Sequence, residues 1–236
     1  KRQKYNWPSS ILVATGKNSK ETVIEVAKIL DGQMPLSASV QSTDLEVLKN
    51  VKRKNIKLED IFAVGLSAKK YGANTYADII LALPGDTMQA HKKTLKDVID
   101  ADIDFTTPFQ FMMLKGTHLA TSSSKKEYQM LSRYRVLPRC FGSYHFLNNK
   151  FIVAEIEEIC VANLTLSFDD YIEARRLHLL IDIFYNHRSL QEIYLVLSEL
   201  GIGNFSFIEE LHRLNKDLLS KVFDDFENET KNELWH

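Results

Sequence analysis

The segment Asp78 to Thr87, which reads D-I-I-L-A-L-P-G-D-T, constrains the fold more than any other part of the chain. Its apolar run from Ile79 to Leu83 is typical of a parallel strand covered on both faces by helices. Pro84 ends a strand ladder, and Gly85 permits backbone angles that other residues avoid. Asp86 and Thr87 are suited to cap a following helix. The sequence therefore predicts a strand-to-helix junction of the kind that α/β proteins place beside ligands.

Short apolar runs alternate with amphipathic helices from Ile11 to about Met113. This alternation predicts βαβ units with four parallel strands. The expected strands are Ile11–Thr15, Leu36–Val40, the run ending at Leu83, and Ile103 to roughly Met113. Four helices are expected between and after these strands. The first has Val23, Val26, Ala27 and Leu30 on one face, and the second begins with a capping box of Thr43 and Glu46 and turns Leu45, Leu48 and Val51 inward. The third runs from Leu58 to about Tyr71, and the fourth is Met88–Ala101.

The pattern changes after this region. Ala120 to Tyr144 predicts a loop with a short helix, and Phe151–Val161 alternates enough for one further strand. Beyond Thr165 the pattern is helical, with capping boxes expected at Ser189/Glu192 and Ser206/Glu209 and a stop at Gly201. We therefore expect two domains, an α/β unit over 1–164 and a helical extension over 165–236.

Composition excludes several classes of protein. The 236 residues carry 30 basic and 31 acidic side chains, a net charge of −1, so no overall field recruits nucleic acid. No apolar stretch is long enough to cross a bilayer. Two cysteines without a signal peptide fit a reducing cytoplasm. Because the first residue is Lys1, we expect a piece of a longer protein.

Polar side chains follow each expected strand. They are Thr15 and Lys17, then Ser39, Gln41 and Ser42, then Pro84 to Thr87, and then Lys115 to Thr117. The carboxyl ends of neighbouring parallel strands share one rim, where ligands bind in α/β barrels and open sheets. Each cluster also has a purely structural interpretation, since Ser42 and Thr43 can cap a helix and Gly116 can end a strand.

Three segments in order carry a family resemblance: S-V-Q-S-T-D-L-E-V-L-K-N-V-K-R-K-N-I, D-I-I-L-A-L-P-G-D-T and F-M-M-L-K-G-T. Together they resemble the second half of radical S-adenosylmethionine enzymes, and within that superfamily the cobalamin-binding branch. The resemblance covers about residues 10–120 and extends more weakly to about 170. It implies a partial (β/α) barrel of parallel strands that holds S-adenosylmethionine beside an iron-sulfur cluster, which cleaves it reductively to an adenosyl radical.

The resemblance also implies roles for individual residues. Ser39, Gln41 and Ser42 would lie near the ribose and methionine of the cofactor, and Arg53 would reach its carboxylate with a guanidinium fork. Leu81, Ala82 and Leu83 would wall the adenine pocket. Pro84 and Gly85 would let the backbone approach closely, and Met112 and Leu114 would add apolar or backbone contacts. Apolar walls with a few convergent polar groups suit an adenosine site.

One departure from the family is large. The superfamily's C-x-x-x-C-x-x-C loop is absent, and Cys140 and Cys160 cannot supply three thiolates. The resemblance therefore implies a fragment of an oxidoreductase or methyltransferase, inactive alone, whose parent holds the cluster, S-adenosylmethionine, a possible cobalamin and an unknown small-molecule substrate. Its expected partner is the missing amino-terminal half of the barrel, and the exposed sheet edge could support oligomers.

Other interpretations remain open. The α/β part could be a non-catalytic scaffold whose carboxyl-terminal helices bind a protein partner. An aldolase-like barrel for a phosphorylated substrate is disfavoured because the rim lacks a clear lysine or carboxylate dyad. Cys140, His145 and Cys160 lack metal-site spacing, and His178, His187 and His212 fit packing or surface roles. Neither a G-x-S-x-G elbow nor a Walker loop is present.

Overall fold

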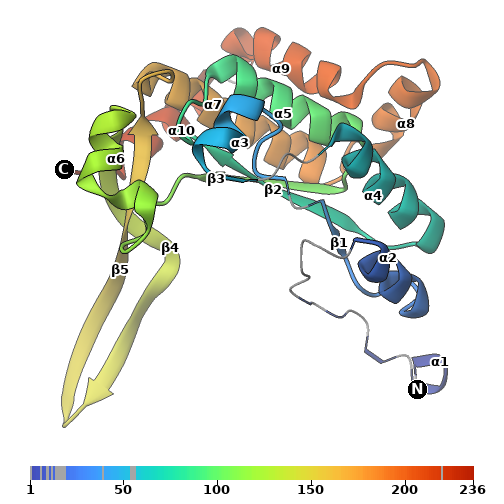
Figure 1. Cartoon of the computed structure of the whole chain (residues 1–236), viewed down its shortest axis with the longest axis horizontal. Coiled ribbons are helices and arrows are strands. Elements are labelled where there is room, and N and C mark those ends of the chain that lie inside the picture. The colour runs from blue at the N-terminus through green and yellow to red at the C-terminus, as the bar shows by residue number, and fades with distance from the viewer. Residues whose placement is uncertain are drawn as a thin grey trace.

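The computed structural model describes residues 2–5, 7–8, 11, 13, 20–38, 40–53, 57–218 and 220–236. The described chain forms a parallel sheet with helices, a long two-stranded ribbon and a helical carboxyl-terminal region (Figure 1). The first part comprises α1 (Arg2–Tyr5), α2 (Lys20–Ile29), β1 (Leu36–Ser37), α3 (Leu45–Asn50), α4 (Leu58–Tyr71), β2 (Thr75–Leu81), α5 (Met88–Asp100) and β3 (Phe105–Gln110). The rest comprises the 3-10 turn η1 (His118–Ala120), α6 (Ser122–Glu127), β4 (Leu131–Phe146), β5 (Asn149–Ala162), α7 (Phe168–Ile181), the π-helical turn η2 (Asp182–Asn186), α8 (Gln191–Glu199), α9 (Asn204–Leu218) and α10 (Ser220–Asn232).

The first sheet has the order β1-β2-β3, with all pairs parallel. The predicted α/β architecture with parallel strands is thereby confirmed, and α4 has the predicted bounds. Most of the strand predicted at Ile11–Thr15 lies outside the described residues, so the described part of this sheet has three strands. Helix α5 begins where the junction predicts, because the Thr87 hydroxyl accepts a hydrogen bond from the Ala90 amide at 3.0 Å.

Among the described residues, helices cover one face of this sheet only, whereas the sequence predicted that helices bury both faces. Helices α4, α5 and α7 lie above β2 and β3 in Figure 1 and share a core with Ala77 and Ile79. On the opposite face, Phe105 is 44% and Phe109 49% exposed. Their cross-strand neighbours Tyr76 and Ile80 are half-buried, and Asp78 is exposed. Within the apolar run Ile79–Leu83, Ile79 and Leu81 are fully buried and Ile80 is half-buried on the open face, whereas Ala82 and Leu83, which follow β2, are both buried.

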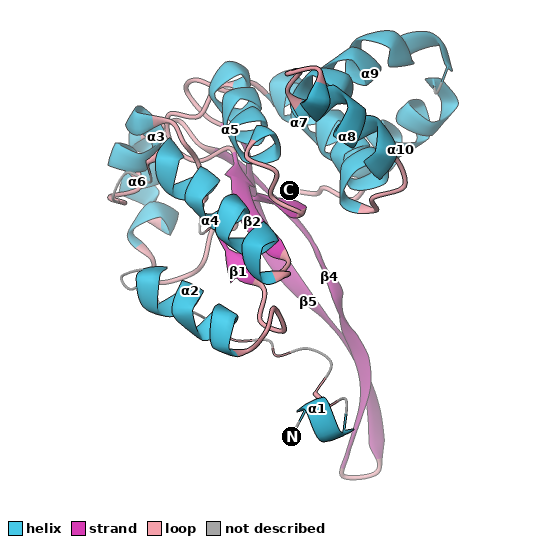
Figure 2. Ribbon diagram, turned by 90° about the vertical axis from the view of Figure 1, so that its right-hand side faces the viewer, coloured by secondary structure: helices cyan, strands magenta, loops and turns pink. Residues whose placement is uncertain are grey.

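The sequence analysis predicted only one of the two strands that form the ribbon of β4 and β5. The strand predicted at Phe151–Val161 is confirmed as β5, and the short helix as α6, but residues 131–144 form β4 rather than a loop. The antiparallel register shifts between Val136 and Phe141, around Pro138. Because proline and a register shift interrupt strict alternation, the period-2 signal of β4 is weak. In Figure 1 and Figure 2 the ribbon extends well beyond the parallel sheet and the helices α4, α5 and α7 that pack on it.

The carboxyl-terminal region is helical, as predicted. Its core residues, among them Leu177, Phe205 and Phe223, join one cluster with residues of α4 and α5. The division into domains at 164/165 stays a prediction. Gly201 follows α8 with φ +71°, as its stop role requires. No helix among the described residues is long and apolar enough to cross a membrane.

Three predicted capping boxes are wrong. Asp44, not Thr43, caps α3 by accepting hydrogen bonds from the Glu46 and Val47 amides. Helix α8 has Leu190 at its cap with no side-chain hydrogen bond, and Ser206 lies inside α9. A capping box joins Ser167 and Asp170 at the start of α7, where the sequence analysis did not predict one. Two side chains predicted to face inward are exposed, Leu45 at 63% and Val26 at 37%.

Candidate functional site at the carboxyl edge of the parallel sheet

The ends of the three described parallel strands meet at one edge. The Ile80 amide donates to the Gln41 carbonyl at 3.0 Å, and the Phe111 amide donates to the Leu81 carbonyl at 3.0 Å. The segments that follow β1 and β3 therefore lie on either side of the end of β2. This is the edge at which α/β folds bind ligands, because loops and helix starts converge there.

The turn after β2 has an unusual backbone. Ala82 has φ +65° and Gly85 φ +85°. Both lie in the left-handed region, which glycine enters freely but alanine does only at a cost. The buried Asp86 carboxylate stabilises this shape by accepting a hydrogen bond from the Ala82 amide at 3.1 Å. The sequence indicated the Pro-Gly turn but not the left-handed Ala82.

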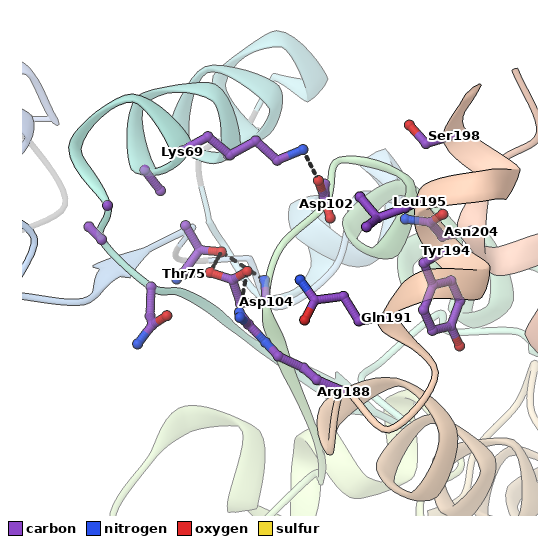
Figure 3. Close-up of a pocket in the computed structure, with 15 residues that line it drawn as sticks. Lys69, Thr75, Asp102, Asp104, Arg188, Gln191, Tyr194, Leu195, Ser198 and Asn204 are labelled. Carbon is purple, nitrogen blue, oxygen red and sulfur yellow. Dashed lines mark hydrogen bonds and ion pairs between the residues drawn. The ribbon is translucent and has the colours of Figure 1, made fainter.

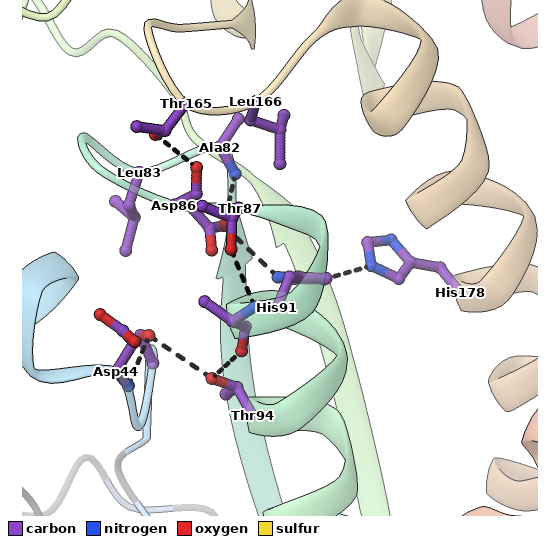
Figure 4. Close-up of polar contacts among 12 residues, drawn as sticks. Asp44, Ala82, Leu83, Asp86, Thr87, His91, Thr94, Thr165, Leu166 and His178 are labelled. Atoms are coloured by element: carbon purple, nitrogen blue, oxygen red, sulfur yellow. Dashed lines mark hydrogen bonds and ion pairs between the residues drawn. The ribbon is translucent and has the colours of Figure 1, made fainter.

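Side chains from distant segments fasten the same turn (Figure 4). Asn163 donates to the carbonyls of Ala82 at 3.4 Å and Leu83 at 3.0 Å, and Thr165 donates to the Asp86 carbonyl at 2.6 Å. Asn50 of α3 donates to the carbonyl of Pro84 at 3.1 Å. Each of these backbone carbonyls already has a donor, so the turn is held rigidly before any ligand arrives. Sequence analysis missed Asn163 and Thr165, which follow β5 and carry no local motif.

A buried chain of titratable groups lies beneath the turn. The Asp86 carboxylate is 3.6 Å from Nδ1 of His91, and Nε2 of His91 is 2.7 Å from Nε2 of His178. Burial lowers the pKa of His178 well below its usual value, and the neighbouring His91 and Arg175 lower it further. His178 is thus held neutral on the inner face of α7, which agrees with the predicted packing role.

Ser42 takes part in a network that joins the end of β1 to α5. Its hydroxyl lies 3.4 Å from the Thr94 hydroxyl and accepts from the Asp44 amide at 3.1 Å. Thr43 donates to the Asp97 carboxylate at 2.7 Å. Because Ser42 is buried and bonded in this way, its observed contacts are those of a structural residue.

The residues predicted to bind the cofactor fall into groups with different access to solvent. Leu81, Leu83 and Pro84 are buried within the chain, whereas Gln41, Gly85 and Met112 are half-buried at the edge. Arg53 is exposed just after α3, and Ser39 lies outside the described residues. Their roles in cofactor binding stay predictions. Of the whole set, Gln41, Gly85 and Met112 are the residues that lie at the carboxyl edge of the sheet and are also partly exposed to solvent.

The cysteines do not fit an iron-sulfur cluster. Burial raises the pKa of the Cys160 thiol to about 12, so it stays protonated at neutral pH, and Cys140 lies on the ribbon. Within the described ranges, no group of three or more His, Cys, Asp or Glu side chains could hold a metal ion. Cluster ligation requires several thiolates, and these residues do not provide it.

A pocket of about 320 Å³ lies at the opposite, amino-terminal edge of the sheet (Figure 3). Thr75 and Asp104 form its floor beside Arg188, and α4 and α8 form its walls. Lys69 pairs with Asp102, and Arg188 pairs with Asp104, so the charges in the pocket largely neutralise one another. Sequence analysis did not indicate this pocket, because its residues come from strand beginnings and from the helical region.

Comparisons with known proteins relate part of the chain to methyltransferases. Over 97 residues, 40% of this chain, it is 33% identical to 2-(S-pantetheinyl)-carbapenam-3-carboxylate methyltransferase of Streptantibioticus cattleyicolor. Over 97 residues it is also 30% identical to the cobalamin-dependent radical SAM methyltransferase TokK of Streptomyces tokunonensis. The aligned stretch spans 14% of each relative's length. No family model matches the chain. The similarity is distant and partial, and it agrees with the resemblance to the radical S-adenosylmethionine superfamily.

Proposed function

We propose that this chain supplies one side of an S-adenosylmethionine site in a larger cobalamin-dependent radical S-adenosylmethionine methyltransferase, and that it is inactive alone. The observation that carries the proposal is the sheet face that the described residues leave uncovered, beside the converging strand ends. Parallel sheets are ordinarily covered on both faces. A sheet that forms part of a (β/α) barrel instead turns one face to the barrel interior, where further strands and their side chains fill the space. Phe105 and Phe109 on the open face are suited to such a contact.

Within this proposal the chain's own residues bind and orient the cofactor. The half-buried Gln41 amide offers a donor and an acceptor to hydroxyl groups, and Gly85 lets a ligand approach the backbone. Met112 offers an apolar, polarizable surface. S-adenosylmethionine, when bound, supplies a methyl or adenosyl group. The cluster ligands and any cobalamin would come from other parts of the parent protein, since Cys140 and Cys160 do not fit the cluster.

Calorimetric titration with S-adenosylhomocysteine, the unreactive product of methyl transfer, tests the proposal. We expect weak, saturable binding that Gln41→Ala reduces roughly fivefold to tenfold, the effect of losing one hydrogen bond of about 1 kcal/mol. Arg188→Ala, in the pocket at the other edge, is the matched control and should leave the affinity unchanged. The opposite result, with Arg188→Ala harmful and Gln41→Ala harmless, would move the ligand to the amino-terminal edge and contradict the proposal.

A second candidate is a non-catalytic scaffold that binds a protein through its helices. The observation in its favour is the exposed apolar side chains of α8 and the residue that follows it, with Leu195 at 59%, Val196 at 53% and Leu200 at 68%. Exposed apolar patches of this kind often mark interaction surfaces. Absence of any saturable nucleoside binding would favour this scaffold over the cofactor site.

A further inference from the structure

The pocket at the amino-terminal edge of the sheet deepens into an inner recess. The recess has a volume of about 60 Å³ and shares Arg188, Gln191 and Asn204 with the main pocket, while Tyr185 lines the recess alone. In Figure 3 the side chains of Gln191 and Leu195 extend from the helical region toward the sheet edge. A recess of this size admits a water molecule or one polar group of a ligand.

Asn204 brings an unsatisfied polar atom to both parts of the pocket. The residue is 8% exposed, and its Oδ1 has no hydrogen-bond partner among the described residues. Most buried polar atoms in folded proteins have a partner, because an unpaired one costs free energy. Since Asn204 lines the main pocket and the recess, a donor that enters the pocket can supply the missing hydrogen bond.

The two sides of the pocket are fastened to each other without a ligand. The Tyr185 hydroxyl donates to the Ile103 carbonyl at 2.6 Å. The Asn186 side chain exchanges two hydrogen bonds of 2.9 Å with the backbone of Thr106. These bonds attach the helical region to β3 and to the residues just before it. The pocket is therefore preformed, as small-molecule sites usually are.

The charged side chains of the pocket are paired with one another. Lys69 pairs with Asp102, and Arg188 pairs with Asp104, so these four side chains carry no net charge. Asp104 also accepts hydrogen bonds from the amide and the hydroxyl of Thr75, at 2.7 and 3.0 Å. A charged ligand would meet no attracting field and would have to displace one member of a pair. The electrostatics of the pocket therefore favour an uncharged ligand.

The hydrogen-bonding side chains that are left free are uncharged. Within the described part of the chain, Asn74, Gln191 and Ser198 make no side-chain hydrogen bond. Together with Asn204 they offer carboxamides, which both donate and accept, and one hydroxyl. Leu195 adds apolar surface beside them. This lining is complementary to hydroxyl and amide groups carried on a small carbon skeleton.

We propose that the pocket binds an uncharged small molecule with several hydroxyl or amide groups, such as a monosaccharide, and that Asn204 accepts a hydrogen bond from it. The ligand contacts α4 and the beginning of β2 on one side and α8 on the other, so its binding stabilises their packing. The pocket lies at the edge opposite the proposed cofactor site. This proposal therefore does not rest on the proposed function.

Titration of the full ¹⁵N-labelled chain with sugars of similar size and different charge, followed by NMR, tests the ligand class. D-glucose and N-acetylglucosamine are uncharged, glucosamine carries an ammonium group, and glucuronate carries a carboxylate. We expect at least one uncharged sugar to bind saturably in the millimolar range and to shift the amide signals of Gly72, Gln191 and Asn204. Each charged sugar should bind roughly tenfold more weakly. Failure of both uncharged sugars to bind, or equal or tighter binding of a charged one, would overturn the proposal.

Substitutions separate ligand binding from folding. Asn204→Leu removes the acceptor but no hydrogen bond of Oδ1 in the free protein, so it should weaken sugar binding roughly fivefold to tenfold and leave the melting temperature unchanged. Gln191→Leu, at an exposed position, should weaken binding similarly and serves as the second variant if Asn204→Leu does not fold. Asn232→Leu, exposed at the end of α10, is the matched control and should change neither quantity.

Two results with these variants would contradict the site. Unchanged sugar affinity in both Asn204→Leu and Gln191→Leu would place the ligand elsewhere on the protein. A lower melting temperature of Asn204→Leu with unchanged affinity would show that Asn204 serves the fold and not a ligand.

Discussion

Nε2 of His91 and Nε2 of His178 lie 2.7 Å apart in the interior, joining α5 to α7. One ring must donate its hydrogen to the other, so at least one of the two accepts through a bare nitrogen. Nδ1 of His178 has no hydrogen-bond partner among the described residues. The pair connects the helix that follows the β2 turn with the first helix of the carboxyl-terminal region.

Acid should destabilise the protein through His178. Burial lowers the folded-state pKa of His178 below its usual 6.5, so the unfolded chain binds the extra proton first. The stabilising contribution is complete above pH about 6.5 and is lost as the pH falls below it, by about 1.4 kcal/mol per pH unit until the folded-state pKa is reached. We expect urea denaturation at pH 7 and pH 5 to show a smaller loss for His178→Gln than for the wild type. His187→Gln, at an exposed position, should keep the wild-type loss.

Arg135 should be essential where the ribbon of β4 and β5 joins the rest of the fold. It donates to Glu157 at 2.7 Å, to Glu233 at 3.1 Å and to the Gln110 side chain at 2.7 Å. Burial opposes its charge, but the hydrogen bond to Glu157 and the nearby carboxylates outweigh burial and raise the pKa of Arg135. Arg135→Met leaves Glu157 buried without its cation and should cost about 3–5 kcal/mol of unfolding free energy in chemical denaturation. Arg213→Met breaks an exposed pair and should have little effect, and equal losses in the two variants would contradict this role.

Two glycines with similar backbone angles should respond differently to alanine. Gly85 has φ +85° and Gly116 φ +86°. A Cβ on Gly85 would lie 2.4 Å from Nδ2 of Asn50, whereas a Cβ on Gly116 meets nothing within 4 Å. We expect Gly116→Ala to cost about 1 kcal/mol of backbone strain. Gly85→Ala should cost about 1–3 kcal/mol more, because it also displaces the donor to Pro84. Thermal denaturation of both variants measures the difference in unfolding free energy. Equal losses in the two variants would show that the Asn50 side chain moves aside without cost.

The two thiols should differ in reactivity. Burial raises the pKa of Cys160 to about 12, and its carbonyl partner Ala162 holds it in place. Cys140 is partly accessible on the ribbon. Iodoacetamide at pH 8 should therefore modify Cys140 first in the folded protein and Cys160 only after denaturant is added, as mass spectrometry of the peptides would reveal.

Reconstitution with iron and sulfide should yield no stoichiometric cluster absorbance, and a stable cluster would contradict the assignment of these cysteines.

The sequence predicted those elements whose signal is local and strong. Helix α4 combines a long amphipathic pattern with Gly72 as a left-handed stop, and α5 begins at a threonine cap behind Pro84 and Gly85. The position of Gln41 beside the end of β2 was predicted, because parallel pairing places the carboxyl ends of neighbouring strands at one edge. Short capping patterns were less informative, because Asp44 competes with Thr43 one residue away and accepts two amides instead.

The features that the sequence did not predict depend on contacts between residues that lie far apart in the chain. Asn163 fastens a turn that lies eighty residues earlier in the chain, as its hydrogen bond to Leu83 spans 80 positions. The pocket between α4 and α8 joins Thr75 to Arg188 and exists only after the helical region has packed. The open face of β2 could not be inferred from its apolar residues, because exposure depends on which helices cover the sheet and not on the strand itself.

The hydrogen bonds between Tyr134 and Trp235 set an order on assembly. During synthesis, Tyr134 leaves the ribosome long before Trp235 does. Until Trp235 is made, the backbone amide and carbonyl of Tyr134 lack the hydrogen-bond partners that they have in the folded protein. Until then, this part of β4 is a candidate for capture by chaperones or for premature association with other nascent chains.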